Sequence, residues 1–187
     1  QQAVKLSQLV ESIQVADPAK PLVLIGDYNA FDFSDGYVDV MGIIAGTPAP
    51  AADVLLWAGS AVTRPLLNLT TTLPQSVRYS YVFEGNTQTL DHALVNQAVL
   101  DTARPSLYHA RVNADFAIDN AADTAVPLRT SDHDPLVVEF EVPTFLDSNV
   151  GVDLRTLDDR THFKADVPVP FFAHVSNTGT HRALDTE

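Results

Sequence analysis

The sequence has no cysteine among its 187 residues and few basic side chains. The absence of cysteine excludes disulfide bridges, thiolate metal sites and cysteine nucleophiles, so a metal ion would have to be held by oxygen or imidazole ligands. Lysine and arginine total 11 against 24 aspartates and glutamates, which gives a formal net charge of -13. Passive binding to nucleic acid is therefore not expected, because it depends on Lys and Arg side chains that contact phosphates.

Long hydrophobic runs are also absent. No window approaches the roughly 20 apolar residues needed to cross a bilayer, and no signal peptide is recognisable at Gln1. Hydrophobic residues make up 45% of the chain and charged residues 19%, which is typical of a packed globular protein. Lysine is scarce and aspartate outnumbers glutamate. This composition is compatible with an extracellular or salty medium, in which salt screens the charges, so we expect a secreted protein.

The first part of the chain has an α/β pattern. Apolar residues at near-helical spacing predict an amphipathic helix over 4–15. The apolar run 21–25 follows a proline and predicts a strand buried on both faces, which ends in the polar loop 26–29. Residues 36–44 are compatible with a short helix. A helix followed by a buried strand and a polar loop indicates α/β layering.

The middle of the chain predicts further strands. Residues 78–83 and 89–95 are strand-like runs, and we expect them to pair as a β-hairpin across 84–87, where Gly-Asn supplies the positive φ of a tight turn. One or two helical turns are expected over 96–103. The apolar run 136–142 predicts a closing strand.

The remaining segments set the domain boundaries. Residues 111–130 are polar and predict a loop, and 143–150 predict a linker. The segment 151–187 follows the linker, and strands are expected within it at 152–154 and 167–175. With 37 residues this segment is shorter than the roughly 100 residues of an immunoglobulin-type sandwich, so it is expected to be the start of such a β domain or a few additional strands.

Asp27 and Asn29 follow directly after the first predicted strand. Ligands often bind at the carboxyl ends of strands in α/β sheets. A carboxylate and an amide two residues apart have the ligand types for a hydrated Mg²⁺ ion and a phosphate oxygen. An Asx turn that closes the loop explains the same two residues, and this motif alone favours the turn.

A second polar motif, Ser131-Asp132-His133-Asp134-Pro135, precedes the last predicted strand of this part of the chain. A histidine that takes a proton from water needs a carboxylate to orient it, and Asp91 is the candidate. Asp91 lies among apolar residues in a predicted strand, where an unpaired carboxylate is costly. Taken singly, Asp132 as a turn cap and His133 as a solvated loop residue are equally compatible with the sequence.

Three motifs in this order resemble the endonuclease/exonuclease/phosphatase family, which includes deoxyribonuclease I and exonuclease III. They are the segments 24–30, 81–92 and 131–135. The segments 35–40 and 111–115 are most similar to large secreted bacterial nucleases of that family. The resemblance covers about residues 4–142.

The resemblance implies a role for each matching residue. It makes Asp27 the active-site carboxylate near the scissile phosphate and the metal, and Asn29 the amide that binds phosphate. Asp91 would orient the catalytic histidine. His133 would be the base or a phosphate ligand, and Asp132 a carboxylate on the metal side. The implied cofactor is Mg²⁺, with Mn²⁺ or Ca²⁺ as alternatives.

The family also has features upstream of its Gly-Asp-x-Asn motif that this chain lacks. They are a strand that bears an Asn, a metal-binding Glu after a Gln, and a His or Tyr that acts as an acid. The resemblance therefore implies that residues 1–142 are the carboxyl-terminal half of the domain and that an amino-terminal half is a partner. The expected fold is half of a four-layer α/β sandwich, with two packed, mainly antiparallel sheets flanked by helices, followed by a short β segment.

The expected function is metal-dependent hydrolysis of a phosphodiester, with DNA or RNA as substrate and no membrane span. Alternatives on the same fold are a phosphomonoesterase, a phosphoinositide phosphatase or a sphingomyelinase, and a catalytically incomplete chain would be a binding module. Tyr79, Tyr81 and Phe83 alternate along one predicted strand, which is more typical of a core face than of a base-stacking surface. The other histidines are expected to be structural or at the surface, namely His109, His162, His174, His181 and His92, and His92 is the candidate for an exception because it adjoins Asp91.

Overall fold

The computed structural model describes residues 1–119, 125–142, 150–156 and 171–177. The chain divides into two compact units, residues 1–142 and 143–187. Helices and small antiparallel sheets occur together in the first unit, so the α/β composition expected from the sequence is confirmed.

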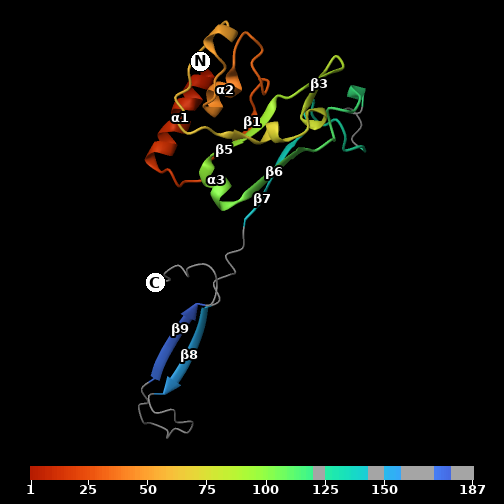
Figure 1. The fold of residues 1–187 in the computed structure, drawn as a ribbon. Helices are drawn as coiled ribbons and strands as arrows, with labels where there is room; N and C mark the ends of the chain where they lie inside the picture. Colours follow the sequence, from red (N-terminus) through yellow and green to blue (C-terminus); the bar gives the residue numbers. More distant parts are fainter. Residues whose placement is uncertain (120–124, 143–149, 157–170, 178–187) are drawn as a thin grey trace. The chain divides into compact units, whose positions relative to one another are not determined.

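A three-stranded antiparallel sheet forms the centre of the first unit (Figure 1). Its middle strand is β5 (Asp91–Val95), which lies between β1 (Val23–Asp27) and the short β2 (Leu67–Asn68). The β1–β5 register places Val23 opposite Val95 and Asp27 opposite Asp91. Because paired residues share a face of the sheet, Asp27 and Asp91 lie side by side on one face.

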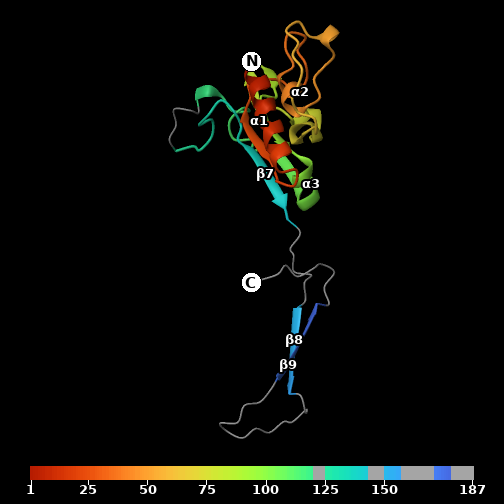
Figure 2. The ribbon, with the colours of Figure 1, turned by 90° about the vertical axis from the view of Figure 1, so that its left-hand side faces the viewer.

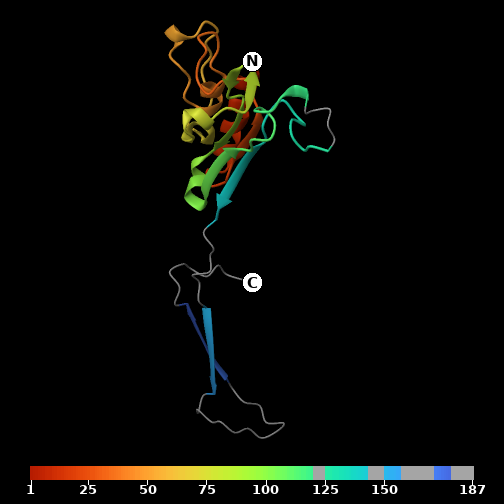
Figure 3. The ribbon, with the colours of Figure 1, turned by 90° about the vertical axis from the view of Figure 1, so that its right-hand side faces the viewer.

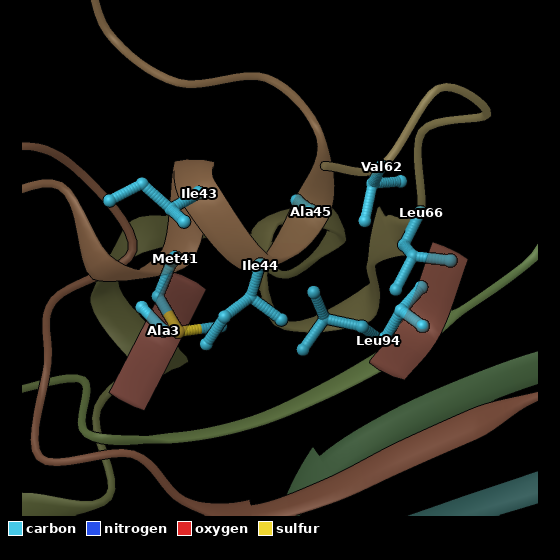
Figure 4. Packing of buried hydrophobic residues seen from close by; sticks show 9 residues of the cluster. Ala3, Met41, Ile43, Ile44, Ala45, Val62, Leu66 and Leu94 are labelled. Carbon is cyan, nitrogen blue, oxygen red and sulfur yellow. The ribbon is translucent and has the colours of Figure 1, made fainter. Parts of the chain in front are cut away.

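Helices α1 (Gln2–Ala16) and α2 (Val40–Ala45) cover one face of this sheet. The predicted helix over 4–15 is confirmed. In the core cluster of Figure 4, Ile44 lies between Met41, which is also on α2, and Leu94, which is on β5. The predicted helix over 36–44 begins later, because the Asp39 side chain accepts a hydrogen bond from the Gly42 amide at 2.9 Å and so caps α2.

The other face of β5 packs against a second, two-stranded sheet. It consists of β6 (Arg104–His109) and β7 (Leu136–Glu141), and α3 (Gln97–Thr102) connects β5 to β6. A second core cluster fills this interface with Leu69, Ala93, Val95, Val99 and Leu107. In Figures 2 and 3, α1 and β7 lie on opposite sides of the central strands. Strand β7 and helix α3 were predicted from the sequence, whereas strand β6 was not.

The prediction that the first strand is buried on both faces is wrong. Val23 and Ile25 of β1 are 40% and 54% exposed, whereas their cross-strand partners Val95 and Ala93 on the same face of β5 are fully buried. The β6–β7 sheet contacts β5 on this face and leaves β1 open. The apolar run therefore predicted the strand correctly. It did not show that one face of this strand is left uncovered by the described residues.

The predicted hairpin exists with different partners. Strand β3 (Tyr81–Phe83) pairs with β4 (Asn86–Gln88), and the turn residues Glu84 and Gly85 have φ values of 48° and 83°. Strand β5 instead joins the central sheet. Positive φ at both central positions is the geometry of a type I′ turn, which joins adjacent strands through two residues. The residues directly after the turn therefore form β4 and pair with β3, and β5 follows β4 and pairs with β1.

The segments between these strands contain short 3₁₀ helices, η1 (Ala51–Asp53), η2 (Leu69–Thr72) and η3 (Gln75–Val77). In the described residues of 111–130 there is no α-helix or strand, as expected for a loop. Among the described residues, no helix is both long and apolar enough to cross a membrane.

In the second unit, β8 (Val150–Thr156) and β9 (Phe171–Asn177) form an antiparallel pair. They correspond to the strands expected at 152–154 and 167–175. Of the predicted linker 143–150, residues 143–149 lie outside the described residues, and Val150 is the first residue of β8. The immunoglobulin-like character of 151–187 stays a prediction.

Candidate active site

Four chain segments meet at one end of the central sheet and form an open pocket of about 810 Å³. They are the end of β1, the β3–β4 hairpin, the start of β5 and the loop before β7. The lining residues are Asp27, Asn29, Tyr81, Phe83, Gln88, Leu90, Asp91, Ser131, Asp132 and His133. All five residues to which the sequence analysis gave a role therefore line one pocket.

His133 and Asp91 form the shortest hydrogen bond between two side chains that line this pocket. Nδ1 of His133 lies 2.7 Å from Oδ2 of Asp91, although the two residues are 42 positions apart in the sequence. The contact predicted between them is therefore present. A carboxylate can only accept a hydrogen bond here, so Nδ1 donates the proton and Nε2 keeps its lone pair. His133 in this tautomer can accept a proton at Nε2.

Ser80 fixes the orientation of Asp91. The hydroxyl of Ser80 donates to the same Asp91 Oδ2 at 2.6 Å and accepts the backbone amide of Asp91 at 3.2 Å. Ser80 is fully buried, and the Asp91 side chain is 13% exposed. The carboxylate is thus partly shielded from water and held by two hydrogen-bond donors. Sequence reasoning missed Ser80, since its only signal was a polar residue between Tyr79 and Tyr81.

Asp27 and Asp91 form a pair of like charges. They are directly opposite each other in the β1–β5 register, and ligand atoms of Asp27, Asp91 and His133 all lie within 4.8 Å of one another. Two carboxylates facing each other across a strand pair repel, and a bound cation removes that repulsion. The three side chains together offer the oxygen and imidazole ligands of a divalent metal site.

The Asx turn considered for the first motif is also present. Oδ1 of Asp27 accepts the backbone amide of Asn29 at 2.8 Å, and Asn29 has a φ of 49°. Both residues are exposed. One carboxylate can serve both purposes, because the turn engages only one of its oxygens and a carboxylate has further lone pairs.

The structure places two further side chains, Asp91 and His133, beside Asp27, where they could hold a metal ion. Asp132 lines the pocket and is exposed, but it is not one of the three residues whose ligand atoms cluster. Its loop turn is closed by Ser131, whose Oγ accepts the backbone amide of His133 at 3.2 Å. Asp91 is the carboxylate that lies beside Asp27, because β1 and β5 are neighbours in the sheet, and the metal role of Asp132 stays a prediction.

Asp134 anchors the loop that carries His133. Oδ1 of this buried carboxylate accepts the backbone amides of Val112, Asn113 and Ala114 at 3.1, 2.8 and 3.0 Å, and Oδ2 accepts Arg111 at 2.8 Å. Burial by itself would raise the pKa of Asp134, but the amides and the guanidinium outweigh burial and lower this pKa. This role was not predicted from the sequence, although Asp134 stands inside the motif 131–135.

The buried histidines have no part in this pocket. His92 lies on the opposite face of β5, with Nδ1 3.1 Å from Asn68 Nδ2 and Nε2 2.8 Å from the Ala30 carbonyl oxygen. Burial lowers the pKa of His92 and, with help from the charge of Arg111, lowers the pKa of His109 to about 4. Neither histidine lines the pocket, although His92 adjoins Asp91 in the sequence.

Comparison with family models, with curated proteins and with solved structures found no match to this chain. The resemblance to the endonuclease/exonuclease/phosphatase family therefore stays a prediction that rests on its three motifs.

Proposed function

We propose that this chain carries half of the active site of a metal-dependent phosphodiester hydrolase of the nuclease type. The observation that supports this most strongly is the cluster of Asp27, Asp91 and His133 in one open pocket, with the His133–Asp91 contact at 2.7 Å. A histidine oriented by a carboxylate next to a second carboxylate is an arrangement suited to general-base and metal-assisted hydrolysis.

A divalent cation such as Mg²⁺ suits these residues, with Mn²⁺ or Ca²⁺ as alternatives. Asp27 and Asp91 would hold it, because their facing carboxylates repel each other and offer hard oxygen ligands. A bound cation would polarise the phosphate and reverse the negative field of the pocket toward a polyanionic substrate. The chain's charge of -13 makes such a reversal necessary before a polyanion can approach.

The protein side chains have separate tasks in this proposal. Nδ1 of His133 donates to Asp91, so Nε2 takes a proton from the attacking water while the water oxygen forms a bond to phosphorus. Asn29, exposed at the pocket, hydrogen-bonds a phosphate oxygen. The bond from phosphorus to the leaving oxygen breaks, and the resemblance assigns protonation of that oxygen to the amino-terminal half.

The open face of β1 supports the proposed partner half. Val23 and Ile25 are exposed on the face that continues from the buried Val95 and Ala93, and among the described residues β1 has a neighbour only at its β5 edge. An apolar sheet face beside an unpaired strand edge is a surface that another segment can cover and extend. We propose that the amino-terminal half covers it and completes the four-layer sandwich.

Two measurements test the function. Isothermal titration of the chain with Mg²⁺ and with Mn²⁺ should show binding that Asp27→Asn weakens about tenfold or more. The control Asp53→Asn, which changes an exposed carboxylate outside the pocket, should leave the binding unchanged. Hydrolysis is then measured with plasmid DNA, RNA, a phosphoinositide and sphingomyelin, using the chain together with its amino-terminal half. We expect nucleic acid to be cleaved and His133→Ala to abolish cleavage.

Hydrolysis of the phosphoinositide or sphingomyelin with nucleic acid left intact would replace the nuclease proposal by one of the alternatives on the same fold. Metal binding that is unchanged in Asp27→Asn would contradict the metal site. Binding of metal and nucleic acid without hydrolysis of any of the four substrates would contradict the proposed hydrolase and favour the alternative of a binding module.

A further inference from the structure

Three rings follow one another along the wall of the pocket. The ring of Tyr81 stacks on His133 with centroids 4.7 Å apart and an interplanar angle of 30°. The ring of Phe83 follows Tyr81 at 6.4 Å and 20°. Tyr81 and Phe83 stand two positions apart on β3, so they lie on the same face of the hairpin. The row therefore leads from His133 outward along the hairpin.

The outer ring is accessible. Phe83 is 50% exposed and lines the pocket together with Asp27, Asn29 and His133. The sequence favoured a core face for this alternation, but β3 pairs only with β4 among the described strands, and the hairpin projects from the central sheet (Figure 1). An aromatic ring kept half exposed beside a polar cluster is a surface for ligand binding, since burial in a core would shield it from water.

A polar side chain stands next to the rings. Gln88 is opposite Tyr81 in the β3–β4 register and also lines the pocket. Its amide offers both donors and an acceptor. Stacking surfaces with a neighbouring amide are suited to nucleobases, which present a π face and a hydrogen-bonding edge.

We propose that Phe83 and Tyr81, with Gln88 beside them, form a subsite for one unpaired nucleobase of the substrate whose phosphate lies at Asn29 and His133. This assignment rests on the proposed function and names its substrate class as single-stranded or frayed nucleic acid. A base inside a duplex has its faces covered by its neighbours, so it must leave the stack to contact the rings. Substrates that are already unpaired avoid this cost.

The main rival ligand for the rings is a quaternary ammonium group such as that of phosphocholine, because acidic side chains surround the pocket. Such cations are bound by cages in which several aromatic rings surround the charge. Tyr81 and Phe83 are instead near-parallel at 20°, and a quaternary ammonium group has no hydrogen-bond donor or acceptor for Gln88. The arrangement therefore favours a base.

The test compares three small ligands that share a phosphate. Adenosine 5′-monophosphate, ribose 5-phosphate and phosphocholine are titrated into the whole chain in the presence of Mg²⁺, and binding is followed by NMR chemical shifts. We expect the nucleotide to bind about 5- to 100-fold more tightly than ribose 5-phosphate, the range expected for stacking one base. We expect Phe83→Ala to remove this difference and Phe83→Trp to retain it.

Phe33→Ala is the matched control. Phe33 is 62% exposed and also stacks on another ring, that of Phe31, but it does not line this pocket. The control should keep the full preference for the nucleotide. His133→Ala should weaken nucleotide and ribose 5-phosphate alike, because it acts on the phosphate and not on the base.

The outcomes separate this inference from the proposed function. Equal, His133-dependent binding of nucleotide and ribose 5-phosphate would overturn the base subsite and leave the phosphate site standing. Tighter binding of phosphocholine than of the nucleotide would overturn it in favour of a choline subsite. Absence of binding by all three ligands, or binding indifferent to His133→Ala, would overturn both proposals.

Discussion

His109 gives a stability prediction that the structure makes quantitative. It lies on β6 opposite Leu136, is 5% exposed, and neither ring nitrogen has a hydrogen-bond partner among the described residues. Burial is the main reason why its pKa falls to about 4, and the charge of Arg111 adds to the effect. The carboxylates of Asp91 and Asp134 act in the opposite direction but do not compensate.

The sign follows from proton binding. The unfolded chain binds a proton at His109 below its ordinary pKa of about 6.5, whereas the folded protein does so only below about 4. The stabilisation from the neutral ring is thus fully present above pH of about 6.5 and is lost as the pH falls to about 4. The gap of about 2.5 between the two pKa values corresponds to about 3 kcal/mol of unfolding free energy.

The assay is urea unfolding between pH 7.5 and 4 of the natural chain and of His109→Leu, which cannot titrate. The natural chain should lose about 3 kcal/mol relative to the variant over this range. Contributions of other groups, including His92, whose pKa is also lowered by burial, cancel in the difference between the two proteins. Parallel stability curves for the two proteins would refute the argument that His109 is buried in its neutral form.

Four further outcomes are expected. Asp91→Asn should lower the hydrolysis rate of the assembly with its amino-terminal half by about 100-fold or more, because it removes the charge that orients His133; unchanged initial rates would contradict this role. Asp134→Ala should reduce the unfolding free energy by about 3 kcal/mol or more in urea titrations, since it leaves buried amides and Arg111 unpaired. Asp27→Asn should weaken Mn²⁺ binding about tenfold or more in calorimetry. Residues 1–187 without the amino-terminal half should scarcely cleave plasmid DNA, and full EDTA-sensitive activity would show that no second half is needed.

Local features of the chain were predictable because short-range physics decides them. The spacing of apolar residues specified α1, and the apolar runs located β1 and β7. The polar residues that follow β1 and precede β7 could be recognised as candidates for a site, because strand ends hold such side chains in fixed directions.

Which residues meet depended on the tertiary structure. The turn at Glu84 and Gly85 assigned β4 to β3 and freed β5 to pair with β1, which brought Asp91 opposite Asp27. Sequence distance carries no information about this register. The sequence therefore indicated Asp27 and Asp132 as candidate metal ligands but not that Asp91 faces Asp27.

The sequence by itself determined the types of side chain in the site, its acidic character and its lack of cysteine. Only the tertiary structure decided that Ser80 holds Asp91, that Asp134 anchors the His133 loop on three backbone amides, and that Phe83 stays exposed beside them. These are contacts between segments distant in sequence, and their energies depend on burial. Burial is a property of the packed fold, because it is set by what every neighbouring element covers and leaves open.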